Sequence, residues 1–430
     1  MSIELLPLGQ SCNLACAYCY EEPMRAAGNE REGAYDFDRM FAGLLAEGVG
    51  QPIAGGYGLT GFTVFGGEPL LLPRADLLRV CEWAQAKGVP LGVQTNGSLI
   101  TPWHLDVFAR FHVTVGISID GPEDLNDLRW VASEAATRDA TRRTVTAIAA
   151  LVAAGRPPSM IVTLSRVNAA PDRLGRLVSW ITAWIARGVT AWNFHTLETD
   201  NGTEARQLST AEAVGAATAL IALGDRHGLE FSPWSDMRRA LVAEDDTGVN
   251  CIWHACDPLT TNAVRGVDGQ GHRKNCGRVN KDGVPARKAD TAGHERQLAL
   301  YLTPQEFGGC QGCRFFLACG GECPGTAEGG DWRSKTAHCA TLQATFPLIE
   351  AAIVRAGGVP LSLSLDRPRV EAAMVAAWMR GESLTRAAAL RGATGTPVVA
   401  HGDRPHVDTP HRDHTDRPAA VVPRAEAVSA

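Results

Sequence analysis

Apolar and polar positions alternate along the first half of the chain in a pattern typical of repeated strand–helix units. Short apolar, β-branched runs that end at polar turns predict six strands, at Ile3–Pro7, Phe62–Phe65, Pro90–Gln94, Val113–Ile119, Met160–Leu164 and Ala191–Leu197. Helical spacing of apolar residues between and after these runs predicts helices at Phe37–Glu47, Arg74–Lys87, Arg138–Ala154, Pro171–Arg187 and Thr210–His227. Six such units predict an α/β fold with a parallel sheet covered by helices, whose reactive groups lie at the carboxyl ends of the strands.

The pattern changes after about Phe231. From there to Cys339 the chain is dense in Gly, Asn, Asp and Cys, its predicted helices are short, and we expect metal sites rather than a core of its own to hold it together. Helical spacing returns at Leu363–Leu390, and the end of the chain, rich in Pro, Asp, Arg and His, is expected to be a disordered tail. The predicted domains are therefore 1–235, 236–345, 346–394 and 395–430.

Composition excludes some classes of partner. The 430 residues carry a net charge of −6 and no long Lys/Arg run, so a nucleic-acid partner is not expected. The chain has no apolar run of about 18 residues to span a membrane and no signal-peptide pattern at Met1, so we expect a cytoplasmic protein without membrane association.

The twelve cysteines are clustered. Three lie between Cys12 and Cys19 and eight between Cys251 and Cys339, while Cys81 stands alone and is expected to be a small buried hydrophobe. Disulfides are rare in the cytoplasm, so metal or cluster ligation is the leading interpretation.

The first group has the spacing Cys12-x3-Cys16-x2-Cys19 directly after the first predicted strand. Three thiolates on one loop can hold three corners of a [4Fe–4S] cube and leave the fourth iron open for another ligand. A structural zinc or cluster site that lacks one ligand is the alternative. The motif resembles the signature of the radical S-adenosylmethionine (SAM) superfamily, and the resemblance covers about residues 4–200.

Motifs at later strand ends extend this resemblance. Gly66-Gly67-Glu68-Pro69, Gln94-Thr95-Asn96-Gly97 and Ser118-Ile119-Asp120-Gly121 end the second, third and fourth predicted strands. The resemblance implies a partial (β/α)6 TIM-type barrel that binds SAM and cleaves it to methionine and a 5′-deoxyadenosyl radical. The SAM-binding residues that it implies are Tyr18 beside adenine, Gly66, Gly67 and Glu68 at the methionine amino group, Gln94 and Asn96 at the end of the third strand, Ser118 and Asp120 at the ribose and carboxylate, Arg129 at the carboxylate, and Leu197 for a backbone contact to adenine.

The second group resembles the SPASM domain, an extension of some radical SAM enzymes with two auxiliary clusters, over about residues 250–345. The family pattern implies two closed [4Fe–4S] clusters, one held by Cys251, Cys256, Cys276 and Cys323 and the other by Cys310, Cys313, Cys319 and Cys339. Zinc bound by the Cys-x2-Cys pair is the alternative, and would make this part a binding module without catalysis.

Relatives with this domain mature peptides, mature sulfatases or oxidise small molecules. Sulfatase maturases carry an Asp base directly after the cysteine that corresponds to Cys276, and this chain has Gly277 there. Asp257 and Asp282 are nearby, but a surface or disordered position is the commoner one for Asp. We therefore expect peptide maturation that forms a thioether, C–C or C–N crosslink, and no conversion of a sulfatase-motif peptide.

The resemblance also implies partners. An electron donor such as flavodoxin or ferredoxin would reduce the first cluster. The first strand begins almost at Met1, which leaves no room for a leader-binding domain before it, so we expect the peptide to bind the barrel directly or through a separate recognition protein.

Overall fold

A computed structural model describes residues 3–27, 35–53, 58–197, 202–244, 251–253, 256–261, 263–280, 288–289 and 293–394. Residues 3–394 belong to one compact unit. The predicted tail 395–430 lies outside the described residues. None of the described helices has the length and apolar character needed to cross a bilayer.

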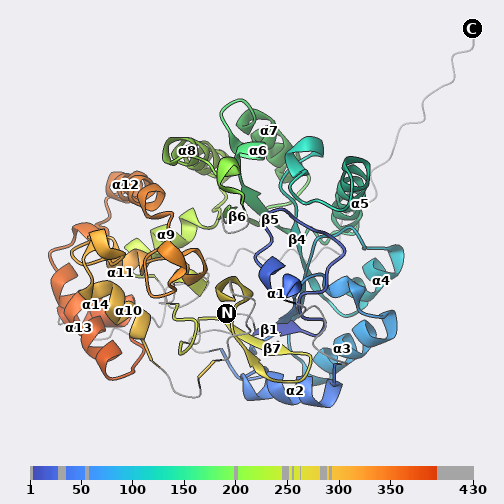
Figure 1. The fold of residues 1–430 in the computed structure, drawn as a ribbon, viewed down its shortest axis with the longest axis horizontal. Coiled ribbons are helices and arrows are strands. Elements are labelled where there is room, and N and C mark those ends of the chain that lie inside the picture. Colours follow the sequence, from blue (N-terminus) through green and yellow to red (C-terminus); the bar gives the residue numbers. More distant parts are fainter. Residues whose placement is uncertain are drawn as a thin grey trace, which may run out of the picture. The chain divides into compact units, whose positions relative to one another are not determined.

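The central sheet confirms the six predicted strands and their parallel pairing. Its strands are β1 (Ile3–Leu6), β2 (Phe62–Val64), β3 (Leu91–Thr95), β4 (Thr114–Ser118), β5 (Ser159–Leu164), β6 (Trp192–Thr196), β7 (Arg265–Asp268) and β8 (Arg273–Lys274). The order is β6-β5-β4-β3-β2-β1-β7-β8, in which all neighbours are parallel except the β7–β8 hairpin. The cysteine-rich region thus adds a hairpin beside β1, which the sequence did not predict (Figure 1).

Some of the described helices surround this sheet, such as α3, α4, α5 and α7, whereas α10, α11, α13 and α14 form a group away from it (Figure 1). Their bounds are α1 Glu22–Ala26, α2 Phe37–Ala46, α3 Arg74–Lys87, α4 Pro102–Arg110, α5 Glu134–Ala153, α6 Arg166–Ala169, α7 Leu174–Ile185, α8 Thr210–His227, α9 Trp234–Leu241, α10 Glu295–Leu302, α11 Phe316–Cys319, α12 Cys339–Arg355, α13 Arg367–Met379 and α14 Arg386–Thr394. Local signals fix several ends: the Ser209 and Glu212 side chains form a capping box at the start of α8, and Gly228, with φ 64°, ends it.

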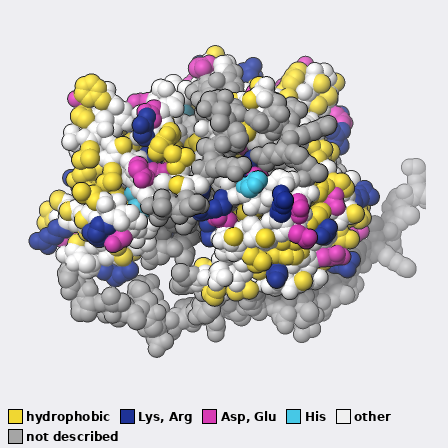
Figure 2. All heavy atoms as spheres, turned by 60° about the horizontal axis from the view of Figure 1, so that its bottom comes forward, with side chains coloured by type: hydrophobic (Ala, Val, Ile, Leu, Met, Phe, Trp, Pro, Cys, Tyr) yellow, Lys and Arg dark blue, Asp and Glu magenta, His cyan; other side chains and the backbone are white. Residues whose placement is uncertain are grey.

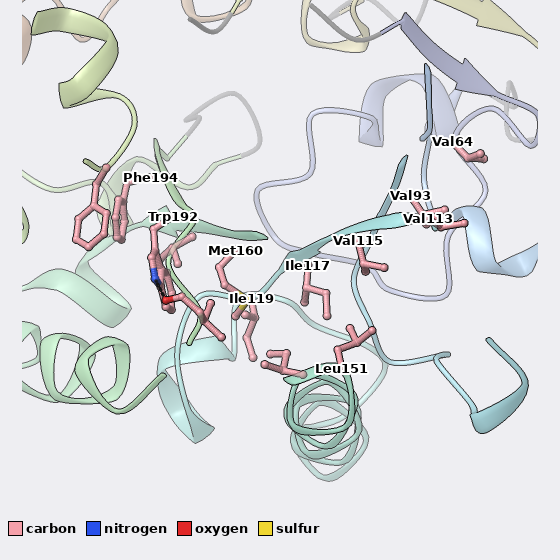
Figure 3. Close-up of a cluster of buried hydrophobic side chains, with 14 of the residues drawn as sticks. Val64, Val93, Val113, Val115, Ile117, Ile119, Leu151, Met160, Trp192 and Phe194 are labelled. Carbon is pink, nitrogen blue, oxygen red and sulfur yellow. Dashed lines mark hydrogen bonds between the residues drawn. The ribbon is translucent and has the colours of Figure 1, made fainter. Parts of the chain in front are cut away.

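The main core lies between the sheet and these helices. Figure 3 shows Leu151 of α5 pointing toward the side chains of Val115 and Ile117 on β4. All three are buried, and so are Val93 of β3 and Met160 of β5 on either side of them in the sheet. This packing covers one face of the strands and leaves their carboxyl ends to carry the site.

The cysteine-rich region shares its apolar core with the C-terminal helices. Leu300 of α10 and Phe316 of α11 pack in one cluster with Val370, Met374 and Trp378 of α13. The apolar partners of this region therefore come from the C-terminal segment, which the sequence did not indicate. That segment is helical, as expected, and consists of two helices, since Gly381, with φ 72°, follows the end of α13.

Charged side chains are mixed over the surface. On the face in Figure 2, the Lys and Arg side chains of the described residues lie among Asp, Glu and hydrophobic ones. This distribution agrees with the modest net charge of −6.

Candidate active site

The first cysteine loop follows β1 and lies against the segment after β4. The amides of Ala15 and Ala17 donate to the carbonyls of Trp130 (2.7 Å) and Leu128 (2.8 Å). Burial, with a smaller contribution from the nearby thiols of Cys19 and Cys12, raises the pKa of the Cys16 thiol to about 12. The structure therefore brings Cys12, Cys16 and Cys19 into one neighbourhood, as the three-thiol interpretation requires.

Three of the implied SAM-binding residues contact one another. The Tyr18 hydroxyl donates to Asp120 Oδ2 at 2.5 Å, and Arg129 Nη1 donates to that hydroxyl at 2.9 Å. Arg129 Nη1 also lies 4.0 Å from Asp120 Oδ1, which accepts from the Thr163 amide at 2.9 Å. Burial raises the pKa of Asp120, and the Arg129 guanidinium opposes that rise. The chain thus links the cysteine loop to the ends of β4 and β5 through charged groups.

The Gly-Gly-Glu motif joins the ends of β1 and β2. A Cβ at Gly67 would lie 2.2 Å from the Ser11 carbonyl oxygen and 2.4 Å from that of Gln10, so only glycine allows this approach. The Gly67 and Glu68 amides donate to the carbonyls of Gly9 (3.0 Å) and Ser11 (2.8 Å). A Cβ at Gly66 would lie 2.5 Å from the Gly9 carbonyl oxygen. The motif therefore fixes the loop that carries Cys12.

Glu68 is buried and anchored on three sides. Its Oε1 accepts from the Leu70 amide at 3.0 Å and the Thr95 hydroxyl at 2.6 Å, and its Oε2 accepts from the Asn96 amide at 2.8 Å. A carboxylate has about four acceptor positions, so one remains for a further donor. Burial raises the pKa of Glu68, whereas these donors and Arg129 lower it.

Glu68→Ala is expected to weaken SAM binding ten- to a hundredfold. It removes a charge-assisted hydrogen bond, worth on the order of 1.5–3 kcal/mol, from a water-poor site. Anaerobic titration measures the affinity, and thermal unfolding reports the cost of the three lost internal bonds separately. Glu82→Ala, on the exposed side of α3, is the matched control. Unchanged SAM affinity in Glu68→Ala would mean that Glu68 only holds the strand ends together through its three hydrogen bonds.

The other implied SAM-binding residues lie at the same strand ends. Gln94 Nε2 donates to Ser118 Oγ at 2.9 Å, and Asn96 Nδ2 donates to Asn13 Oδ1 at 2.9 Å. Leu197 follows β6 and is fully buried.

Sequence reasoning missed a layer of polar residues beneath these groups. Asn13 Nδ2 donates to Ser98 Oγ at 3.0 Å, while Asn126 accepts from the Asp120 amide and Asn168 donates to the Asp120 carbonyl. Asn13 lies inside the cysteine motif, and this position was the one sequence feature that could have indicated its role. The remaining partners come from loops whose contacts no motif reveals.

Four of the downstream thiols form one neighbourhood. Burial raises the pKa of the Cys276 thiol, and the nearby thiols of Cys323 and Cys251 raise it further. Cys256 is likewise close to Cys323 and Cys276. Cys251 therefore lies beside the other three residues of the set that the family pattern implies.

The other four thiols form a second neighbourhood. Cys310, Cys313, Cys319 and Cys339 line one small pocket, closed by Phe315, Phe316 and Phe346 among others. Burial raises the pKa of Cys310 to about 12, and Cys313 and Cys339 add to the rise.

The donor sets fit iron–sulfur cubanes. Each downstream set supplies four thiols, and the first loop supplies three. Among the residues that the structure describes, no three His, Cys, Asp or Glu side chains gather closely enough to hold one metal ion. A four-iron cube spans more space than one ion, so its thiols stand farther apart. Cys81 is buried on α3 within the main core, as expected of a small hydrophobe.

Two carboxyl groups lie beside the first downstream set. Burial and, to a smaller extent, the Glu21 carboxylate raise the pKa of Glu4, on β1, to about 7 against the opposing charge of Arg278. A Cβ at Gly277 would lie 1.9 Å from Glu21 Oε1. Glu21 therefore occupies the space that a side chain at position 277 would take.

Of Asp257 and Asp282, the two aspartates near Cys276 in the sequence analysis, the structure describes the first. Asp257 is buried, and its Oδ1 accepts from the amides of Leu259 (2.9 Å) and Thr260 (3.2 Å), so it caps a turn. The expectation of a surface or disordered residue was wrong for Asp257, because these donors satisfy its charge inside the protein. Asp282 lies outside the described residues.

Comparison with known proteins agrees with this geometry. Residues 6–172 match the family described as "Radical SAM superfamily". The chain therefore carries a radical SAM domain.

Several curated proteins are similar in sequence to part of this chain. A serine-type anaerobic sulfatase-maturating enzyme of Bacteroides thetaiotaomicron is 30% identical over 125 residues, 28% of this chain and 30% of that protein. The enzyme of the same name from Klebsiella aerogenes is 31% identical over 133 residues, 29% of this chain and 31% of its own. An AdoMet-dependent heme synthase of Nitratidesulfovibrio vulgaris is 33% identical over 116 residues, 26% and 28% of the two chains. The matched part thus spans about a third of each relative's length.

A solved structure resembles nearly the whole described fold. It is described as native anSMEcpe with bound AdoMet and Cp18Cys peptide. The likeness has a TM-score of 0.61 at 15% identity and covers 83% of this chain and 100% of that one. At this identity the likeness establishes the fold alone, and it extends well past the radical SAM domain into the cysteine-rich region.

Proposed function

We propose that this enzyme holds three [4Fe–4S] clusters and oxidatively modifies a peptide side chain. The observation that carries the proposal is the gathering of eleven cysteines into one set of three at the strand ends and two sets of four beyond them. The set of three, with SAM bound, would supply the radical that removes a hydrogen atom from the substrate, and the sets of four would accept the electron left behind.

The surrounding residues would position SAM. Tyr18, Asp120 and Arg129 form one hydrogen-bonded group beside Cys16, suited to the sugar and carboxylate. Glu68 retains one acceptor position for an ammonium group.

A peptide substrate is supported by the related structure. That protein has the same fold over 83% of this chain and was solved with both AdoMet and a peptide bound. A second protein for leader recognition and a low-potential one-electron donor belong to this proposal as partners.

Two kinds of peptide chemistry fit this site, crosslinking and the formylglycine formation of sulfatase maturation. Gly277 favours crosslinking, because formylglycine formation needs a base at that position. The Glu21 carboxylate in the same space weakens this argument and favours formylglycine formation as a specific second candidate.

Mass spectrometry separates these candidates. The enzyme is incubated anaerobically with SAM, reductant and either a sulfatase-motif peptide or a candidate precursor peptide encoded beside it. A crosslink removes two hydrogen atoms per bond from the precursor, and formylglycine has its own fragment mass in the other peptide. Modification of neither, with the required recognition protein supplied, would favour a small-molecule substrate instead.

Visible absorption of the anaerobically purified protein tests the cluster sets themselves. Iron–sulfur clusters are brown, whereas zinc is colourless. A colourless, zinc-loaded protein would favour the binding module without catalysis.

A further inference from the structure

Arg296 of α10 is a fully buried cation whose side chain, among the residues that the structure describes, donates hydrogen bonds to backbone carbonyls only. Its Nε donates to Trp332 O at 2.7 Å. Its two terminal nitrogens donate to the carbonyls of Cys256 (3.3 Å), Gly320 (3.2 Å), Gly321 (3.0 Å), Glu322 (2.9 Å) and Ser334 (3.2 Å). Five N–H groups thus serve six acceptors, and the guanidinium is saturated with hydrogen bonds.

These carbonyls place the guanidinium between the two downstream cysteine sets. Residues 320–322 are the whole connection from Cys319, in one set, to Cys323, in the other. The carbonyl of Cys256, in the same set as Cys323, completes the contact. Consistent with this position, the Arg296 charge lowers the pKa of Cys256 in one set and of Cys310 in the other, against the rise that burial causes.

The charge of Arg296 has no carboxylate partner among the described residues. The Asp257 carboxylate touches Arg296, but its Oδ2 accepts from the Arg296 backbone amide at 3.0 Å rather than from the guanidinium. Carbonyl dipoles satisfy the donors without cancelling the charge, and burying an uncompensated charge is costly. Besides Asp257, thiolates of the two cysteine sets can balance the Arg296 charge, since it acts on both Cys256 and Cys310.

We propose that Arg296 is a shared counter-charge that raises the reduction potentials of both auxiliary clusters. The inference rests on the proposed function, because it requires clusters at both sets. Reduction adds one electron, and so one negative charge, to a four-thiolate cluster. A cation fixed nearby in a poorly screened site favours the reduced form.

Two lysines each act on a single set. Lys288 lowers the pKa of Cys256, and Lys335 lowers that of Cys310 and Cys339. Arg296 is the described cation that faces both sets, so its removal should affect both potentials together, whereas loss of either lysine should act mainly on one.

The test is an EPR-monitored redox titration of the reconstituted enzyme. Arg296→Gln and Arg296→Met remove the charge, and Arg296→Lys keeps it. We expect both neutral variants to shift the oxidised-to-reduced ratio of both auxiliary clusters about tenfold toward oxidised, which is a fall of about 59 mV for a one-electron couple. Arg296→Lys should shift them less, and the SAM-binding cluster should keep its potential.

Arg333→Gln is the matched control. Arg333 stands between Trp332 and Ser334, whose carbonyls bind Arg296, but its own side chain is exposed and pairs with Asp331 at 2.9 Å. The same loss of charge should leave both potentials unchanged because solvent screens it.

Each other outcome is decisive. Unchanged potentials in cluster-loaded neutral variants would overturn the role of Arg296. Loss of the auxiliary clusters from both neutral variants but not from Arg296→Lys would support it, and loss from all three would assign Arg296 a packing role instead. Wild-type protein without auxiliary cluster signals would contradict the proposed function, which is a separate failure.

Discussion

Replacing Cys12, Cys16 and Cys19 together by alanine will abolish SAM cleavage and lower the iron content from about twelve to about eight atoms per chain. The three thiols are the donors that the strand-end loop offers to a cluster, and the Tyr18–Asp120–Arg129 group lies directly beside them. Without the cluster no electron reaches SAM, so 5′-deoxyadenosine should fall to background. The eight downstream thiols are untouched and should retain their iron.

Iron analysis, sulfide analysis and chromatography of 5′-deoxyadenosine measure these effects. Cys81→Ala is the control, since Cys81 is buried in the main core on α3 and belongs to none of the three thiol sets. It should keep all the iron and full SAM cleavage at a modest cost in stability. SAM cleavage by the triple variant would overturn the assignment of the first cluster.

The sheet could be predicted from sequence because each strand is a short apolar run that ends in a polar motif. Ile3 and Leu5 pair with Phe62 and Val64, and these residues already stood out as apolar and alternating. The β7–β8 hairpin escaped prediction because Arg265–Asp268 is short and charged, and its strand character comes from pairing with β1.

The cysteine sets could be anticipated from spacing and resemblance, whereas their electrostatic surroundings could not. Arg296 looks like an ordinary residue at the start of an amphipathic helix. Its burial depends on carbonyls at positions 320–322, 332 and 334, which only the folded chain brings together.

Position 277 shows the same limit most clearly. From sequence, Gly277 means the absence of a base. In the fold, glycine at 277 is the condition for another carboxylate to stand there, since any Cβ would collide with Glu21. A substitution in one segment can therefore be compensated by a residue far away in the chain, and a motif read alone gives the opposite conclusion.

Glu21→Gln is accordingly expected to lower peptide modification about a hundredfold or more while SAM cleavage continues. Loss of a general base typically costs a factor of 10² to 10⁴, and the amide fills nearly the same volume without accepting a proton. The radical would still form, because Cys12, Cys16 and Cys19 are intact, so 5′-deoxyadenosine should be released without matching product. Quantitative mass spectrometry of both the peptide and 5′-deoxyadenosine gives this ratio.

The neighbouring Glu22 supplies the control that separates chemistry from damage to the cysteine loop. Glu22 is exposed and pairs with Arg25 at 3.1 Å. Glu22→Gln therefore removes one carboxylate charge at the adjacent position without changing the space beside Gly277. It should keep product and 5′-deoxyadenosine coupled. Equal loss of product in both variants would mean that Glu21 supports the loop. Full product from Glu21→Gln would remove Glu21 as the base, and Gly277 would again argue against formylglycine formation and for a crosslinked peptide.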